Sequence, residues 1–191
     1  MAWGNNKIRH AGSSDIEELV ELTRLARQES PLTAQLCTPN SGHLTELLTA
    51  WYSLEGCSLL VAESDDKIVG FALVQHVAPS LFSDVAFLQI EGLFVREEFR
   101  RRGIARGLLT EVVNIAEASQ VEHIVTIVLT GARQELRSLA GQGFMPAGAR
   151  RLVDTQTLAR RLSGPNRERR LRSIDELIAR RRRTRDLTTT S

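Results

Sequence analysis

Apolar residues recur with helical spacing in two segments near the start of the chain. Ser14 and Glu17 have the spacing of a capping box, and the apolar positions that follow share one face until Pro31 ends the helix. In the second segment, apolar residues stand at i, i+3, i+4 and i+7, namely Leu44, Leu47, Leu48 and Trp51. Both segments are therefore predicted to be amphipathic helices.

Short apolar runs bounded by turn residues predict the strands. They cover 7–10, 59–62, 67–74, 86–95 and 123–129, with a last strand or strand pair over 144–153. Asp65 and Asp66 fit the turn of a hairpin between the second and third of these strands. Helices predicted over 103–118 and 132–141 separate the later strands, so the pattern indicates a mixed α/β sheet with helices packed on it.

Composition places the chain among ordinary globular proteins. It has 191 residues, of which 42% are hydrophobic and 25% charged. No apolar run approaches the roughly 20 residues of a membrane span, and the first residues lack a signal-peptide core. Cys37 and Cys57 are the only cysteines, which favours free thiols and a cytoplasmic location. The four histidines are scattered, so we expect no metal site.

Charge divides the chain into two parts of opposite sign. Residues 150–191 hold thirteen basic and five acidic side chains, a net charge of +8, and residues 1–149 carry −6. Gly164 and Pro165 add a break in the pattern. We therefore expect a catalytic or binding domain over 1–153 and an Arg-rich helical extension over 154–191.

The extension contains an apolar stripe followed by arginines. Leu171, Ile174, Leu177 and Ile178 fit one face of a helix that runs into the basic run 180–185. The pattern favours a helix that docks on its own domain or on the other subunit of a homodimer. Binding of nucleic acid or an acidic protein through 164–185, or of an anionic membrane surface, stays an alternative.

The segment 90–106 carries the clearest chemistry. An alternating apolar strand runs into a charged loop, a glycine and then a helix. Free backbone N–H groups at a helix start attract anions, and Gly103 lets a ligand approach the backbone closely. Full positive charges surround this turn, at Arg100, Arg101, Arg102 and Arg106. These features predict a phosphate-binding turn.

The motif Arg100-x-x-Gly103-x-Ala105 resembles the acyl-CoA-binding motif of the GNAT superfamily of N-acetyltransferases. The resemblance covers about residues 7–153 and implies a splayed mixed sheet, helices on both faces and acetyl-CoA as co-substrate. It implies that the pyrophosphate is held by the turn Arg100, Arg101, Arg102, Gly103, Ile104, Ala105 and Arg106. It also implies that the pantetheine arm pairs with the backbone of Leu93, Phe94 and Val95, with an N–H near Leu93 polarising the thioester.

Glu91 is the candidate general base. An alkylamine with a pKa near 10 is mostly protonated at neutral pH, so a proton acceptor is needed. The run Ile90-Glu91-Gly92-Leu93-Phe94-Val95 looks like that of diamine and polyamine acetyltransferases, in which this Glu is a proposed base. Strand alternation predicts Glu91, Gln89 and Leu93 on one side of the strand. The alternative is that Glu91 only binds a cationic substrate or a neighbouring Arg.

The sequence departs from the family farther along. Counting back from Gly143-Phe144 puts Leu139 where the family has the Tyr that protonates the thiolate, and Ala132 where it has an Asn. Two functions follow: an N-acetyltransferase for an amine, or a CoA-binding module that regulates or scaffolds through the Arg-rich extension. The acidic balance of 1–149 favours a cationic small molecule as acceptor, with a protein amine as the alternative. The expected acceptor loops, 28–45 and 76–86, carry no motif that names it.

Overall fold

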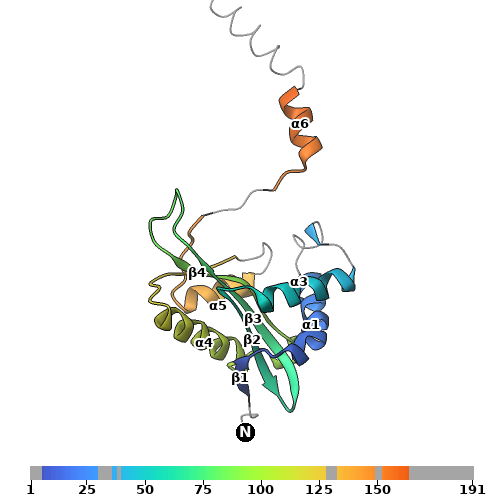
Figure 1. The fold of residues 1–191 in the computed structure, drawn as a ribbon, viewed down its shortest axis with the longest axis vertical. Helices are drawn as coiled ribbons and strands as arrows, with labels where there is room; N and C mark the ends of the chain where they lie inside the picture. Colours follow the sequence, from blue (N-terminus) through green and yellow to red (C-terminus); the bar gives the residue numbers. More distant parts are fainter. Residues whose placement is uncertain (1–5, 30–35, 38–39, 128–132, 149–151, 164–191) are drawn as a thin grey trace, which may run out of the picture. The chain divides into compact units, whose positions relative to one another are not determined.

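The computed structural model describes residues 6–29, 36–37, 40–127, 133–148 and 152–163 (Figure 1). The chain divides into two compact units, Met1–Phe144 and Met145–Ser191. The first unit contains the sheet and its covering helices, and the second contains the helix α6 (Thr155–Ser163). The predicted division after residue 153 stays a prediction, and the apolar stripe and basic run at 164–185 lie outside the described residues.

Five strands form one mixed sheet in the order β1-β2-β3-β4-β5. They are β1 (Lys7–His10), β2 (Cys57–Ser64), β3 (Lys67–Val77), β4 (Phe87–Val95) and β5 (Ile124–Thr126). The first three pairings are antiparallel, and β4 pairs with β5 in parallel. Asp65 and Asp66 have φ angles of 50° and 59°, so they form the predicted tight hairpin turn, with a twist that suits two antiparallel strands.

Two helices cover one face of the sheet: α1 (Ile16–Gln28) and α3 (Ser41–Ser53) (Figure 1). Leu19 and Leu22 of α1 are fully buried in a cluster with Val61 of β2 and Phe71 of β3. The predicted periodicity is confirmed except at one position: α3 adds the nearly buried Leu44 and Leu48 to the same cluster, but Leu47 is 45% exposed.

The start of α1 differs from the prediction. A short 3₁₀ turn, η1 (Ser13–Asp15), precedes it, and the reciprocal bonds join Gly12 to Asp15. The Gly12 N–H donates to Asp15 Oδ2 at 2.7 Å, and the Asp15 N–H donates to the Gly12 carbonyl at 3.0 Å. The prediction of a capping box between Ser14 and Glu17 is wrong, because Asp15 makes the reciprocal bonds with Gly12. The Arg9 guanidinium holds the Asp15 carboxylate in this position and lowers its pKa.

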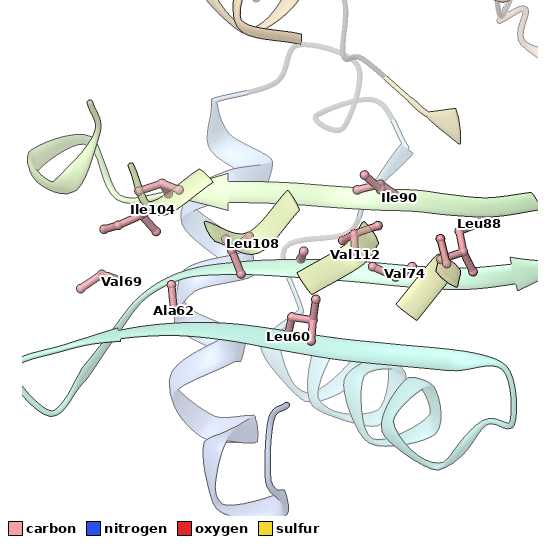
Figure 2. Packing of buried hydrophobic residues seen from close by; sticks show 12 residues of the cluster. Leu60, Ala62, Val69, Val74, Leu88, Ile90, Ile104, Leu108 and Val112 are labelled. Carbon is pink, nitrogen blue, oxygen red and sulfur yellow. The ribbon is translucent and has the colours of Figure 1, made fainter. Parts of the chain in front are cut away.

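The other face of the sheet carries α4 (Ile104–Ala118). Figure 2 shows Leu108 and Val112 of this helix packed over Leu60 and Val74 of the sheet, and all four side chains are fully or almost fully buried. The helix comes close to β1 because residue 107 is glycine: a Cβ there would lie 3.2 Å from Ile8 Cγ1. The expected architecture, a mixed sheet with helices on both faces, is confirmed.

The last predicted strand is absent from the described part of 144–153. Residues 144–148 and 152–153 have no strand structure. Pro146 has no N–H to give to a ladder, and Gly148 has a φ of 143°, outside the strand range of other residues. Before this segment, α5 (Arg133–Gly141) lies close to the predicted 132–141.

Candidate acetyl-CoA and acceptor site

A bulge interrupts β4 next to the candidate base. Leu73 of β3 lies opposite Gly92, and the next β3 residue, Val74, lies opposite Ile90. Glu91 is therefore the extra residue and has no partner across the ladder. Bulges bend a strand and redirect its side chains, and they are common beside active sites.

The bulge reverses the sides on which β4 presents its residues. Ile90 belongs to the core cluster under α4, and Leu93 packs against that same cluster. In a regular strand, residues three positions apart would point to opposite faces of the sheet. The Glu91 carboxylate instead accepts a hydrogen bond from the Gln89 side chain, on the face covered by α1 and α3. The expectation that Glu91 and Leu93 share one side is wrong, because strand alternation fails across a bulge; Gln89 and Glu91 do lie together.

The edge of β4 beyond Ile90 is open among the described residues. The pairing with β5 runs only from Leu88 to Ile90. Farther along, the Arg96 N–H turns to β3 and donates to the Val69 carbonyl at 2.8 Å. Backbone direction alternates along a strand, so Leu93 and Val95 direct their N–H groups away from β3, into the open edge.

Phe94 differs from its two neighbours. Its carbonyl points at β3, where a Cβ on Gly70 would lie only 2.8 Å from that oxygen. Its ring lies on the α1 and α3 side, with its centroid 6.0 Å from that of Phe71. Of the three residues expected to pair with the pantetheine arm, Leu93 and Val95 thus direct their backbone groups to the open edge, and Phe94 directs its backbone to β3.

The predicted phosphate turn joins β4 to α4. After a short 3₁₀ turn, η2 (Glu97–Phe99), two residues adopt left-handed conformations: Arg101, with φ 61°, and Gly103, with φ 80°. The first bond within α4 is from the Gly107 N–H to the Gly103 carbonyl, at 2.9 Å. The three N–H groups before it, from Ile104 to Arg106, therefore have no carbonyl partner inside the helix.

Nothing of the described chain neutralises this helix start. No side chain caps α4, and its first turn contains no acidic residue. Arg101, Arg102 and Arg106 are all exposed there, and the Arg102 guanidinium carbon lies 5.2 Å from the Phe99 ring centroid. Helix dipole and side chains thus combine to favour an anion. Ile104 is buried and Ala105 is half-buried, so these two residues can contact an anion only through their backbone N–H groups.

Arg100 is engaged elsewhere. Its Nε donates to the Val95 carbonyl at 2.9 Å, and one terminal nitrogen binds both carboxylate oxygens of Glu29, at 2.7 and 2.6 Å. Its guanidinium carbon also lies 5.6 Å from the Phe94 ring centroid. The side chain therefore braces the end of α1 against β4, and its charge is already paired.

We expect Arg100→Ala to lower the free energy of unfolding by about 1–2 kcal/mol, since it removes a hydrogen bond and a half-exposed ion pair. CoA affinity should stay within about threefold, because Arg100 is bonded to Val95 and Glu29; loss of a charge-assisted contact to phosphate would weaken binding by more than about tenfold. Denaturant unfolding and calorimetry measure the two quantities. Glu29→Gln is the control, since it removes only the charge of the partner. A large loss of CoA affinity at unchanged stability would make Arg100 a phosphate ligand, as the motif suggests.

The structure adds two residues that the sequence did not single out. Cys57 of β2 lies opposite Gln75 of β3, which lies opposite Gln89 of β4. Residues directly opposite one another share a face, so these side chains form one row, and Gln89 at its end donates a hydrogen bond to Glu91. Burial raises the pKa of the Cys57 thiol, and the nearby Glu91 charge raises it further. Only the strand register reveals this row, because the three residues are far apart in sequence.

Leu139 is buried in α5, with 5% of its surface exposed. Its carbonyl accepts from the Phe144 N–H at 3.1 Å, and Phe144 packs against the α4-side core. A buried leucine cannot give a proton to a leaving thiolate. Ala132, the other departure, lies outside the described residues.

The described residues offer neither a metal site nor a membrane span. They contain no group of three His, Cys, Asp or Glu side chains placed to hold a metal ion. No helix in this part of the chain has both the length and the apolar character that a membrane span requires.

Comparison with known proteins gives a family and a fold. Residues 20–144 match the model of the Acetyltransferase (GNAT) family. No curated protein sequence matches the chain significantly. Solved structures do match, and a transcriptional regulator from Bacillus halodurans C-125 has a TM-score of 0.66 at 19% identity, over 78% of this chain and 99% of that chain.

Two examples among the similar structures are acetyltransferases. One is an aminoglycoside N-acetyltransferase in complex with CoA, with a TM-score of 0.67 at 15% identity, over 80% of this chain and 95% of that chain. The other is the ribosomal-protein-alanine N-acetyltransferase from Brucella melitensis biovar Abortus 2308, with a TM-score of 0.59 at 19% identity, over 78% and 97%. At these identities the likeness shows the fold.

Proposed function

Because this chain belongs to the acetyltransferase (GNAT) family, we propose that it moves an acetyl group from acetyl-CoA to a primary amine. One observation carries the proposal: an open strand edge leads directly into an uncapped, arginine-flanked helix start. These two features suit two adjacent parts of the same ligand, the amide-containing pantetheine arm and the pyrophosphate to which it is joined.

The turn after β4 is the proposed pyrophosphate site. The free backbone N–H groups of Ile104, Ala105 and Arg106 can donate hydrogen bonds to the phosphate oxygens, so no side chain has to lose its water to bind them. Gly103 leaves room for the phosphate oxygens because it has no Cβ. Arg101 and Arg102 add charge at the rim, where long flexible side chains can close on the bound anion.

The open edge of β4 is the proposed seat of the pantetheine arm. An extended amide chain can pair with an exposed strand edge in the manner of an added strand. The N–H and carbonyl of Leu93 and the N–H of Val95 are the groups available, since Arg100 already occupies the Val95 carbonyl. The Leu93 N–H is the proposed donor to the thioester oxygen as negative charge develops there.

The chemical step then needs a proton acceptor and a proton donor. The amine nitrogen attacks the thioester carbon, the C–S bond breaks, and an amide and CoA thiolate result. Glu91 is the proposed acceptor of the amine proton, directly or through water, from its place at the bulge. Water is the proposed proton donor to the thiolate, because Leu139 stands where a phenol would act.

The proposed acceptor is a cationic small molecule. Glu91 presents an exposed carboxylate, which attracts an ammonium group. The similar aminoglycoside N-acetyltransferase acts on a substrate of that kind. A protein amine stays the alternative, in keeping with the similar ribosomal-protein-alanine enzyme. The homodimer and the cytoplasmic location stay predictions.

The second proposed function is a CoA-binding module without turnover. Leu139 favours it, because the family's usual acid is replaced by a buried apolar side chain. Such a module would bind CoA through the same turn and act through its Arg-rich extension.

Thiol release from acetyl-CoA across a panel of primary amines separates the two functions. The enzyme is expected to release one thiol for each amide formed, which mass spectrometry of the products verifies. Tight CoA binding without thiol release from any amine would support the module and overturn the enzyme. Absence of CoA binding by calorimetry would overturn both.

A further inference from the structure

The polar row beside the bulge lies on the face covered by α1 and α3. Cys57, Gln75 and Gln89 stand opposite one another on three adjacent strands, and each is half-buried. The preceding register pair, Leu59 and Leu73, belongs to the apolar cluster under α1 and α3 or packs against it. The face therefore changes from apolar to polar at the point where β4 bulges.

The side chains of this row differ in whether their hydrogen-bonding groups already have partners. Gln89 donates to the Glu91 carboxylate, and so fixes it. Gln75 has no hydrogen-bond partner for its amide in the part of the chain that the structure describes. The Cys57 thiol stays neutral, because burial and the Glu91 charge both raise its pKa. One carboxylate, one held amide and one unused amide thus face the same side.

We propose that this row recognises the acceptor, and that the acceptor is a primary amine carrying a hydroxyl group several atoms away, as in an amino sugar. The inference rests on the proposed transferase function. Glu91 binds the ammonium group, and the unused amide of Gln75 binds the hydroxyl. Gln89 is a positioning residue that acts through Glu91.

Spacing and charge both favour this class of acceptor. The Cα atoms of directly opposite residues, such as Gln75 and Gln89, are about 5 Å apart, and the Gln89 side chain bonds to Glu91, so one small molecule can reach both Gln75 and Glu91. A ring that carries the amine and hydroxyl on opposite carbons spans the gap between two such side chains. A polyamine would need a second carboxylate, and the row supplies an amide there instead.

The test compares trans-4-aminocyclohexanol with cyclohexylamine, which share the ring and the amine and differ by one hydroxyl group. The wild-type chain should use the hydroxylated amine with a kcat/KM roughly 3–10-fold higher, the value of one neutral hydrogen bond. Gln75→Leu should bring that ratio close to one and leave CoA affinity unchanged. Gln156→Leu, the same replacement on α6 in the second unit, is the matched control and should keep the wild-type ratio.

Gln75→Glu gives a second readout that does not depend on whether the fold accepts leucine at position 75. It supplies the missing carboxylate and should shift the preference to trans-1,4-diaminocyclohexane. Thiol release with equal kcat/KM for the two amines, or a ratio that neither Gln75 variant changes, would overturn this inference and leave the transferase function standing. Absence of thiol release from every amine would overturn the proposed function, and the inference with it.

Discussion

Charge reversal of Arg101 and Arg102 together is expected to weaken CoA binding by about 10²–10⁴-fold. Each charge-assisted contact to phosphate contributes about 1.5–3 kcal/mol, and each 1.36 kcal/mol is a factor of ten. Both side chains are exposed at the uncapped start of α4, so reversal places two carboxylates beside the proposed pyrophosphate. Isothermal titration calorimetry with CoA measures the loss.

The matched control reverses Arg160 and Arg161 in α6. It changes the net charge of the chain by the same amount but acts in the second unit. CoA affinity should then stay within about threefold, at an ionic strength that screens long-range effects. Equal losses in the two double variants would mean that net charge, and not this turn, determines the affinity. Unchanged affinity after reversal at Arg101 and Arg102 would overturn the site assignment.

The parts of the fold that could be predicted are those whose sequence pattern is local, such as an apolar repeat along a helix or a pair of turn residues. Helical spacing located α1, α3 and α4, and the Asp65-Asp66 pair located the hairpin turn. The turn that is proposed to bind phosphate was predictable as a backbone structure for the same reason, because a strand, a glycine and a helix start follow one another in sequence. The strand predicted over 144–153 is absent from the described residues there, since Pro146 and the unusual backbone of Gly148 interrupt the apolar run that suggested it.

The site itself depends on contacts that sequence spacing cannot give. Alternation assigns Glu91 and Leu93 to one side, but the bulge adds a residue that only the pairing with Leu73 and Val74 reveals. Arg100 fits a phosphate-binding motif, yet it binds Glu29, which is far away in sequence. Local patterns thus locate the backbone of the site, and long-range pairings decide where its side chains point.

Glu91→Gln is expected to lower kcat by about 10²-fold at neutral pH, the usual size of a general-base contribution, with little change in CoA affinity. The variant keeps the hydrogen-bonding shape of the side chain and its place at the bulge, but it cannot accept a proton. It must therefore rely on acceptor molecules that are already neutral. Stopped-flow or continuous thiol assays from pH 6 to 9 measure the effect.

The pH dependence distinguishes lost proton transfer from lost substrate binding. An acceptor with a pKa near 10 gains about tenfold in free amine for each pH unit over this range. The kcat/KM of Glu91→Gln should rise with that slope, and the wild-type rate should rise less steeply because its base removes the proton in place. Glu117→Gln, an exposed carboxylate on α4, is the control and should follow the wild-type profile. If Glu91→Gln raised only the acceptor KM, with the wild-type pH slope and kcat, Glu91 would be a binding residue for the ammonium group, and the proton would leave through water alone.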